Sequence, residues 1–362
     1  MHYLKVKGSY FEIGKQIGIA FKKEINDYIE FRYYQMCSEM QEMGYLFQRK
    51  DYEAYVPDLK EYIRQNAIDE YQELVGIAQA TSQRVEDIIF SIGYTDIFDL
   101  ILKSKTKKRE LIEHELNSEC STFVIDGSLQ KMCGQNWDMD MVSKENACIM
   151  QKEYSDGLKI CAVTTILGLV HMGMNDVGVC AGTANLSTEN VSSKGIIFPI
   201  VLQNILKTQN RSETLNILNK YKFVSGHYFY IMYPTEHSLL FETVATRYQE
   251  IRFHNNIFVH TNHYVDMKLK EEAISYSLSS IERKQAMEEY LQQNNDLSDQ
   301  NIKKILANHE KGICRHSENK FETVTAASVI FKPKEKQMQI CNNAPCIGEW
   351  LTVNMDSIFK EE

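Results

Sequence analysis

Residues 118–139 read SECSTFVIDGSLQKMCGQNWDM, and they determine how the rest of the chain is interpreted. The run STFVID at 121–126 is short, rich in β-branched and aromatic residues, and ends at Gly127, which predicts a β-strand followed by a turn. The run CGQNWDMD at 133–140 has the character of a second strand. Cys120 therefore stands where the first of a series of strands begins.

The chain before this stretch has a different pattern. Residues 9–109 are helical in character, because apolar side chains recur close to the spacing of one helix face. The first such series is Phe11, Ile13, Ile17, Phe21, Ile25 and Ile29. Similar patterns cover 62–77 and 85–102, and the charged segment 103–118 closes the region. The sequence predicts a mainly helical N-terminal third.

The chain after Cys120 contains about ten short strand-like runs separated by turn residues. Helical patterns interrupt them at 196–206, 211–218, 270–293 and 298–309. This order of strands, helices and strands again predicts an α+β fold, with two sheets packed face to face and helices on their outer faces.

Composition narrows the class of protein. Of 362 residues, 43% are hydrophobic and 25% charged, as in globular proteins and unlike disordered or fibrous chains. The net charge of -9 argues against nucleic acid as a main partner. The first residues lack the pattern of a secretory signal, and no apolar run approaches the ~20 residues of a membrane span, so we expect a cytoplasmic protein without membrane contact. Nine cysteines without a CxxC pair suggest buried or reactive thiols.

The residues around Cys120 also resemble a known family. Glu119-Cys-Ser-Thr-Phe123, followed by Gly134-Gln-Asn-Trp-Asp138, is similar to the acyl-coenzyme A:6-aminopenicillanic acid acyltransferase (isopenicillin N acyltransferase) family, and more distantly to choloylglycine and penicillin V hydrolases. Further matching segments are Gly8–Gly14, Gly182–Ser187, Phe241–Glu242, Val259–His263 and Ile313–His316. The resemblance implies a four-layer αββα sandwich of the N-terminal-nucleophile hydrolase type with a mainly helical N-terminal segment.

The resemblance also implies that the chain cuts itself between Glu119 and Cys120. Residues 1–119 and 120–362 would then form two parts, which we expect to stay associated. The cut gives Cys120 an α-amino group, whose ordinary pKa of about 7.7 to 8.0 suits a base at neutral pH. Glycine or asparagine often precedes such a cysteine, so Glu119 predicts slow or pH-dependent processing.

Three further residues receive roles from the resemblance. Asp138 would accept a hydrogen bond from the new α-amine and orient it. Asn262 would donate its side-chain amide to the oxyanion, a contact that is worth about 3 kcal/mol of barrier in other enzymes. Arg315 would hold Asp138 and the Cys120 terminus, or bind a substrate carboxylate. A backbone N–H near Asn185 would be a second oxyanion donor.

These residues predict an amidohydrolase or acyltransferase that forms a thioester on Cys120. We expect a small-molecule amide or an acyl-coenzyme A-type compound as substrate, with no bound organic cofactor and no metal. Two alternatives stay open: a metal-dependent hydrolase built on His260 and His263, and an unprocessed homologue that serves as a binding scaffold. Each of these residues can also have a purely structural role. Cys120 would then be a core residue, Asn136, Asp138 and Asn262 would be turn residues, and Arg315 would be a surface cation. Trp137 and the aromatic cluster 228–233 would pack between strands.

Overall fold

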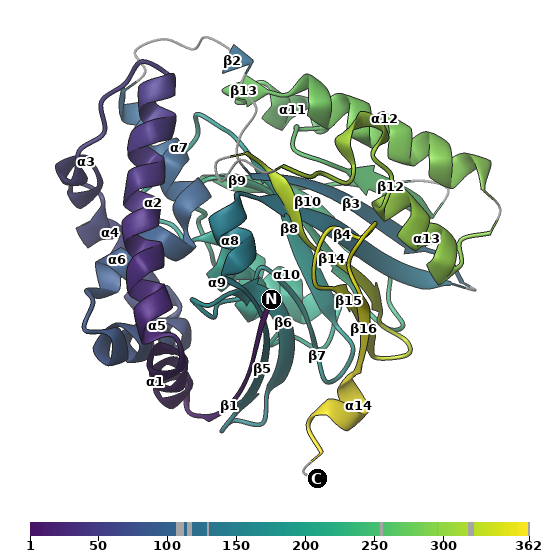
Figure 1. The fold of residues 1–362 in the computed structure, drawn as a ribbon, viewed down its shortest axis with the longest axis horizontal. Helices are drawn as coiled ribbons and strands as arrows, with labels where there is room; N and C mark the ends of the chain where they lie inside the picture. The colour runs from purple at the N-terminus through teal and green to yellow at the C-terminus, as the bar shows by residue number, and fades with distance from the viewer. Residues whose placement is uncertain are drawn as a thin grey trace.

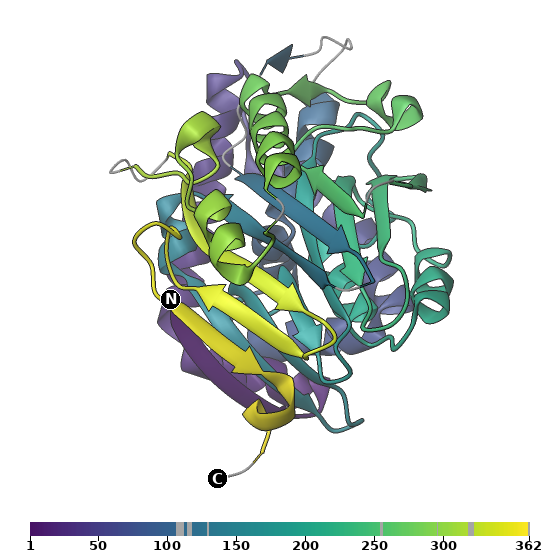
Figure 2. The ribbon, with the colours of Figure 1, turned by 90° about the vertical axis from the view of Figure 1, so that its right-hand side faces the viewer.

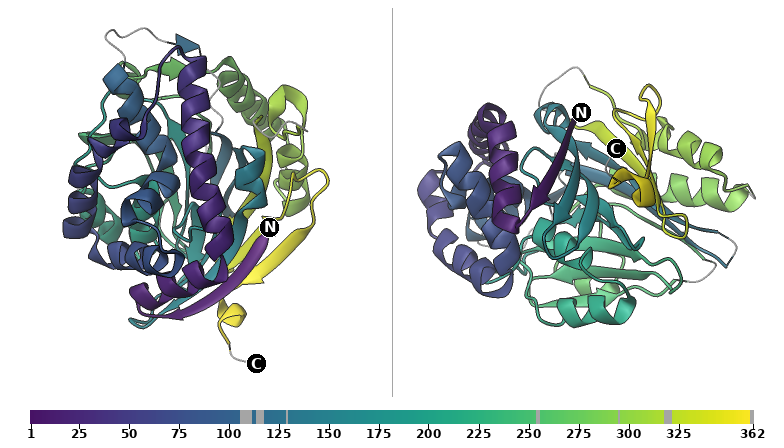
Figure 3. Two further views of the ribbon diagram at one scale, coloured as in Figure 1. Left: turned by 60° about the vertical axis from the view of Figure 1, so that its left-hand side comes forward. Right: turned by 90° about the horizontal axis from the view of Figure 1, so that it is seen from below.

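The computed structural model describes residues 1–105, 112–113, 118–128, 130–253, 256–294, 296–317 and 322–360. Its centre consists of two packed β-sheets, with helices covering both outer faces, as Figure 1 shows. Seen from below, helices, sheet, sheet and helices follow one another as four layers (Figure 3). The predicted αββα sandwich is confirmed.

The first sheet has eight strands. In spatial order they are β1 (His2–Gly8), β5 (Ala147–Tyr154), β6 (Lys159–Thr165), β7 (Met172–Asn175), β8 (Cys180–Leu186), β9 (Gly226–Met232), β10 (Leu239–Val244) and β11 (Arg247–Glu250). Within this sheet the neighbours are antiparallel, except that β1 runs parallel to β5.

The second sheet has six strands, all antiparallel to their neighbours. In spatial order they are β12 (Ile257–His260), β3 (Ser118–Asp126), β4 (Lys131–Met139), β14 (Val324–Lys332), β15 (Gln337–Cys341) and β16 (Trp350–Asn354). The two-residue strands β2 (Ile112–Glu113) and β13 (Ser275–Tyr276) pair separately.

Helices form the two outer layers. Against the eight-stranded sheet lie α1 (Tyr10–Ala20), α2 (Lys22–Glu42), α3 (Arg49–Glu53), α4 (Val56–Asn66), α5 (Ile68–Thr81), α6 (Val85–Ile92), α7 (Tyr94–Lys105), α9 (Phe198–Ile205) and α10 (Arg211–Leu218). Against the six-stranded sheet lie α12 (Leu278–Gln293) and α13 (Asp299–Leu306), in front of the sheet in Figure 2. Shorter helices are α8 (Met141–Glu145), α11 (Met267–Lys270), η1 (Glu310–Gly312) and α14 (Met355–Ile358).

The alternation of side chains along each strand builds the layers, because successive residues point to opposite faces of a sheet. In β3, Phe123 and Ile125 pack against α12 and α13, whereas Cys120 and Val124 face the core between the sheets. Cys120 thus points into the middle of the molecule from a strand whose other face is covered.

Two elements differ from the sequence patterns. Residues 2–8, which show no clear pattern of their own, form β1, and all seven pair with β5. The helix predicted over 270–293 begins only at Leu278, because Lys270 ends α11 and β13 lies between the two helices. The charged segment 103–118 falls partly outside the described residues; its first three residues end α7.

In the part of the chain that the structure describes, no helix is long and apolar enough to cross a membrane.

Candidate active site around Cys120

Cys120 lies in β3, beyond the end of the partner strand β12. β12 pairs with residues 122–125 only, so on that edge the backbone N–H and carbonyl of Cys120 can form hydrogen bonds with side chains. Its N–H donates to Asn262 Oδ1 at 2.8 Å, and its carbonyl accepts from Arg283 Nη1 at 2.6 Å. Asn262 lies two residues after the end of β12, so the pairing of β12 with β3 brings it to the peptide bond between Glu119 and Cys120.

The Cys120 thiol is buried, with 4% of the residue exposed. Gln135 Nε2 lies 3.7 Å from Sγ and Gln135 Oε1 accepts from the Tyr230 hydroxyl at 2.9 Å. Burial raises the pKa of the thiol well above its ordinary range, and the nearby Asp138 carboxyl raises it further, while Arg283 acts in the opposite direction. The thiol in the continuous chain is therefore protonated at neutral pH and needs a base before it can attack.

Glu119 and Asp138 are cross-strand partners on the opposite face of β3 and β4. Both side chains are fully covered, with 1% and 0% exposed. Glu119 Oε2 forms ion pairs with Arg283 Nη2 at 2.9 Å and Arg315 Nη2 at 2.6 Å. The carboxylate next to the expected cleavage site is thus held by two guanidinium groups.

Asp138 has a different environment from Glu119. Glu119 has direct ion pairs, whereas the described residues give Asp138 none, and the oxygens of both carboxyls make no well-oriented hydrogen bond with a described residue. Burial raises the pKa of the Asp138 carboxyl to about 6, against the charge of Arg283, a contact with the Thr325 side chain and the charge of Arg315. A buried carboxyl with only this partial compensation next to Cys120 fits a group that can accept a further hydrogen bond, such as one from an α-amine formed by a cut.

Arg315 is fixed by the strand that follows it. Its backbone N–H donates to Thr325 Oγ1 at 2.9 Å and its carbonyl accepts from the Thr325 N–H at 3.1 Å. Its side chain donates from Nε to the Gly312 carbonyl at 3.2 Å and is 17% exposed. Arg315 is therefore not a free surface cation.

The five residues expected from the sequence converge at one place. Glu119 and Cys120 enter from β3, Asp138 from β4, Asn262 from the end of β12 and Arg315 from the segment before β14. In the continuous chain the Asn262 amide has its oxygen toward Cys120 and donates from Nδ2 to the Asn185 carbonyl at 3.2 Å. The oxyanion role of this amide stays a prediction.

Sequence reasoning missed Arg283. It lies on α12, is completely buried, and contacts the Cys120 carbonyl, Ser121 Oγ, Asn262 Oδ1 and Glu119. In the sequence it is one cation among the many charged residues of a helix. The only available signal was its position four residues before Met287 and eight before Leu291, which places it on the buried face of the helix.

The structure also tests the purely structural roles that the sequence allowed for some of these residues. Asn136 and Asp138 lie inside β4, not in a turn, and Asn136 Nδ2 donates to the carbonyls of Leu306 and Ile313. The ring of Tyr228 stacks on His260 with centroids 3.9 Å apart, so it packs the strands and does not line the pocket beside Cys120.

His260 and His263 do not form a metal site. Nε2 of His260 lies 2.7 Å from Glu242 Oε1 and Nδ1 lies 2.6 Å from the Thr261 carbonyl, so both ring nitrogens are engaged. Nδ1 of His263 lies 2.8 Å from Ser280 Oγ. These contacts fix the loop that carries Asn262, and they leave the metal-dependent alternative without His260, one of its two expected ligands.

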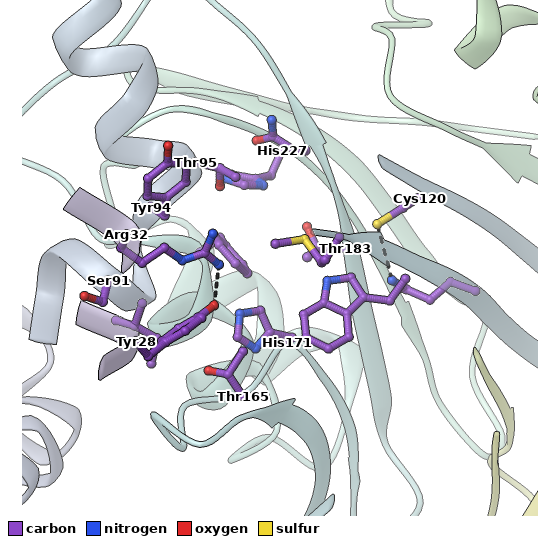
Figure 4. A pocket seen from close by; sticks show the side chains of 16 residues that line it. Tyr28, Arg32, Ser91, Tyr94, Thr95, Cys120, Thr165, His171, Thr183 and His227 are labelled. Carbon is purple, nitrogen blue, oxygen red and sulfur yellow. Dashed lines mark hydrogen bonds between the residues drawn. The ribbon is translucent and has the colours of Figure 1, made fainter. Parts of the chain in front are cut away.

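A narrow pocket extends from Cys120 to the N-terminal helices, with a cavity volume of about 40 Å³ in the continuous chain. Figure 4 shows Cys120 at one end, and Arg32 with Tyr28 at the other. The lining residues contributed by residues 1–105 are Tyr28, Arg32, Ser91, Ile92, Tyr94 and Thr95. Those contributed by later residues are Cys120, Gln135, Trp137, Met139, Thr165, His171, Thr183, Asn185, Phe198 and His227.

The pocket contains buried polar atoms without hydrogen-bond partners among the described residues. They are Arg32 Nε, Thr95 Oγ1, Asn185 Oδ1 and His227 Nδ1. Aromatic and apolar side chains surround them, with the rings of Trp137 and His171 stacked at 5.2 Å. An apolar cavity with a few unsatisfied polar groups is typical of a small-molecule site.

The fold and the site together define a class, an αββα sandwich with a buried thiol at the start of a central strand and a small-molecule pocket beside it. Residues 126–346, more than half of the chain, match the model of the family described as acyl-coenzyme A:6-aminopenicillanic acid acyl-transferase. The chain belongs to this family, in agreement with the enzyme class that the sequence predicted.

Individual relatives are more distant. The chain is 24% identical over 271 residues to the 40 kDa form of acyl-coenzyme A:6-aminopenicillanic-acid-acyltransferase from Emericella nidulans, covering 73% of this chain and 69% of the relative. Among solved structures, a variant of conjugated bile acid hydrolase from Clostridium perfringens is 12% identical with a TM-score of 0.45, covering 66% of this chain and 92% of that one. Penicillin V acylase from Agrobacterium tumefaciens is 10% identical with a TM-score of 0.36, covering 66% and 86%.

Proposed function

We propose that this chain is a cysteine N-terminal-nucleophile enzyme, which cuts itself between Glu119 and Cys120 and then acts on small amides through a thioester on Cys120. The observation that carries the proposal is the convergence on one peptide bond. Asn262 and Arg283 hold its Cys120 side, while the buried Asp138 carboxyl lies close by. Any buried residue here would need partners for its backbone N–H and carbonyl, but it would not need two buried carboxyls, Glu119 and Asp138, and two guanidinium groups at the same peptide bond.

The cut balances without any added reagent except water. Cys120 Sγ attacks the Glu119 carbonyl carbon, the peptide C–N bond breaks, and the nitrogen takes a proton to become the α-amine of Cys120. Water then attacks the thioester carbonyl, releasing residues 1–119 with a new C-terminal carboxylate and restoring the thiol. Asp138 would hold the new ammonium, which a carboxylate does well in a buried site.

Turnover of a substrate would repeat the same chemistry on another carbonyl. The α-amine of Cys120 takes the thiol proton, the thiolate attacks the amide or thioester carbon, and the proton leaves with the departing amine or thiol. Water resolves the acyl-enzyme in a hydrolase, and an amine resolves it in an acyltransferase. We favour amide hydrolysis, because water is always present.

The charges around Glu119 suggest the chemical class of the substrate. Two guanidinium groups, from Arg283 and Arg315, hold the Glu119 carboxylate. When residues 1–119 end at position 119 and that end withdraws, these groups are left to bind another carboxylate. We therefore propose an N-acyl amino acid or similar acid-bearing amide, with its acyl part in the apolar pocket.

The test is the intact mass of the purified protein. We expect two fragments, ending at Glu119 and starting at Cys120, and a single uncut chain for Cys120→Ala, which lacks the thiol. Cys37→Ala, which removes an exposed thiol on α2, is the matched control and should be cut like the wild type.

Processing would be followed by a screen of N-acyl amino acids and acyl-thioesters. Uncut wild-type protein after prolonged incubation, with no reaction of Cys120 with iodoacetamide, would contradict the proposal and favour the binding-scaffold alternative. If the chain cuts itself but turns over no acid-bearing amide, the self-cleavage mechanism is supported and the proposed substrate class is refuted.

A further inference from the structure

Four side chains of the kinds that bind metal ions meet at one place, and two of them lie next to Arg315 in the sequence. His309 precedes η1, Cys314 and His316 flank Arg315, and Cys346 lies in the connection between β15 and β16. One ligand atom from each side chain lies within 4.8 Å of all the others. Two segments of the chain, 309–316 and the β15–β16 connection, thus supply two thiols and two imidazoles to one point.

Three of the distances between these atoms are close to the edges of a coordination tetrahedron, and the one between Cys346 and His316 is shorter than such an edge. With Zn–S of about 2.3 Å and Zn–N of about 2.0–2.1 Å, tetrahedral edges are about 3.8 Å between sulfurs and about 3.3 Å between nitrogens. The Cys314 and Cys346 sulfurs are 3.6 Å apart, and the His309 and His316 Nε2 atoms are 3.2 Å apart. The mixed distances to His316 Nε2 are 3.6 Å from Cys314 and 2.9 Å from Cys346.

The donor set also fits zinc chemically. Two thiolates with two imidazoles form a closed four-coordinate shell, which is the usual composition of structural zinc sites. A disulfide between Cys314 and Cys346 would explain only two of the four residues. It would leave two imidazoles with their Nε2 atoms facing each other at 3.2 Å, and at least one proton would have to lie between them.

We propose that His309, Cys314, His316 and Cys346 bind one Zn²⁺ as a structural site. Four protein ligands leave no open position for substrate, so the ion would stabilise the fold and would not take part in chemistry at Cys120. It would join the segment after α13 to the β15–β16 connection. Because two ligands flank Arg315, it would also fix the backbone that carries this cation. The site stands whether or not Cys120 is a nucleophile.

The first measurement is the metal content of full-length protein purified without chelator and without a histidine tag. We expect about one Zn²⁺ per chain, as for a closed structural site. Cys346→Ser, which alters a surface thiol outside the strands, should lose most of the zinc. Cys37→Ser, an exposed thiol on α2, should keep it.

A second measurement uses only the wild-type protein, so its result does not depend on whether a variant folds. Metal-free wild-type protein is titrated with Co²⁺, and we expect the visible absorption of a tetrahedral ion together with thiolate-to-metal charge transfer. Zn²⁺ at about 100 times its Kd should raise the Tm of the metal-free protein by about 3 °C.

Several results would overturn the proposal. One is a chain that contains no stoichiometric zinc and binds neither Zn²⁺ nor Co²⁺ when its thiols are reduced. Another is a Co²⁺ spectrum without thiolate bands. A third is a Cys314–Cys346 disulfide, detected as a mass lower by two hydrogens, that persists in protein purified under reducing conditions.

Discussion

At the scale of single residues, the region around Cys120 is a balance of buried charges. Glu119 forms ion pairs with Arg283 and Arg315, whereas Asp138 has no direct ion pair among the described residues. Water cannot solvate the ionised form of a fully buried carboxyl, which is why burial raises the pKa of Asp138 to about 6.

This raised pKa predicts how stability depends on pH. The Asp138 carboxyl has an ordinary pKa of about 3.9 in the unfolded chain, so above that pH the unfolded state releases its proton first. The native state is therefore destabilised progressively between about pH 4 and pH 6, by about 3 kcal/mol in total. We expect uncut Cys120→Ala protein to lose this stability as pH rises, and Cys120→Ala with Asp138→Asn to lose correspondingly less.

The measurement is the free energy of unfolding in urea at pH 4, 5, 6 and 7 for both proteins. Other titrating groups contribute equally to the two curves, so their difference isolates Asp138. Parallel curves would mean that the native carboxyl titrates at its ordinary pKa.

At the scale of elements, the strand pairs and outer helices followed from local patterns in the sequence. The runs at 121–126 and 133–140 became β3 and β4, and the apolar series beginning at Phe11 became α1 and α2. These features are visible locally because side-chain alternation and helical spacing repeat within a few residues.

Features that depend on distant partners could not be predicted in this way. β1 carries Lys5 and Lys7 at solvent-facing positions and is defined by its parallel pairing with β5, nearly 150 residues later. Arg283 differs from its charged neighbours on α12 only in being buried. The His309–Cys346 group has no recognisable spacing, because its fourth ligand follows thirty residues after the third.

A buried ion pair connects α5 to β5 and predicts a large effect of one substitution. Lys152 Nζ lies 2.5 Å from Glu73 Oε1, both side chains have no exposed area, and Gln203 and Tyr154 donate to Glu73 Oε2. Lys152→Met should lower the free energy of unfolding by about 3–5 kcal/mol, because it leaves a buried carboxylate without its cation. Adding Glu73→Met should recover most of this loss.

Urea unfolding of uncut Cys120→Ala protein measures both changes. The control is Arg64→Met, which removes an exposed pair with Glu61 three residues away on α4 and should cost less than about 0.5 kcal/mol. Equal effects of the two single substitutions would show that the pair at Glu73 contributes no more than a surface contact.

At the scale of the whole molecule, the two parts on either side of position 119 share one core. The helices of residues 1–105 pack on the eight-stranded sheet, and β1 supplies that sheet with its edge strand. The segments lie side by side in Figure 3. Removal of residues 1–119 would expose both the apolar outer face of the sheet and the open edge of β5.

We therefore predict that processed protein elutes as one species containing both fragments in size-exclusion chromatography under native conditions. Residues 120–362 produced alone should aggregate, because an exposed sheet face and strand edge associate with other copies. Co-production with residues 1–119 should restore soluble protein. A soluble, monomeric 120–362 fragment with cooperative unfolding would contradict this prediction.

The composition of the pocket has a consequence for how the family can diversify. The thiol and the polar groups around it come from residue 119 onward, whereas six of the sixteen residues that line the pocket come from residues 1–105. Under the proposed function, changes at Tyr28, Arg32 or Ser91 would reshape the space for an acyl group and leave the proposed nucleophile untouched. New substrate preferences would then be able to arise through changes in the first third of the chain alone.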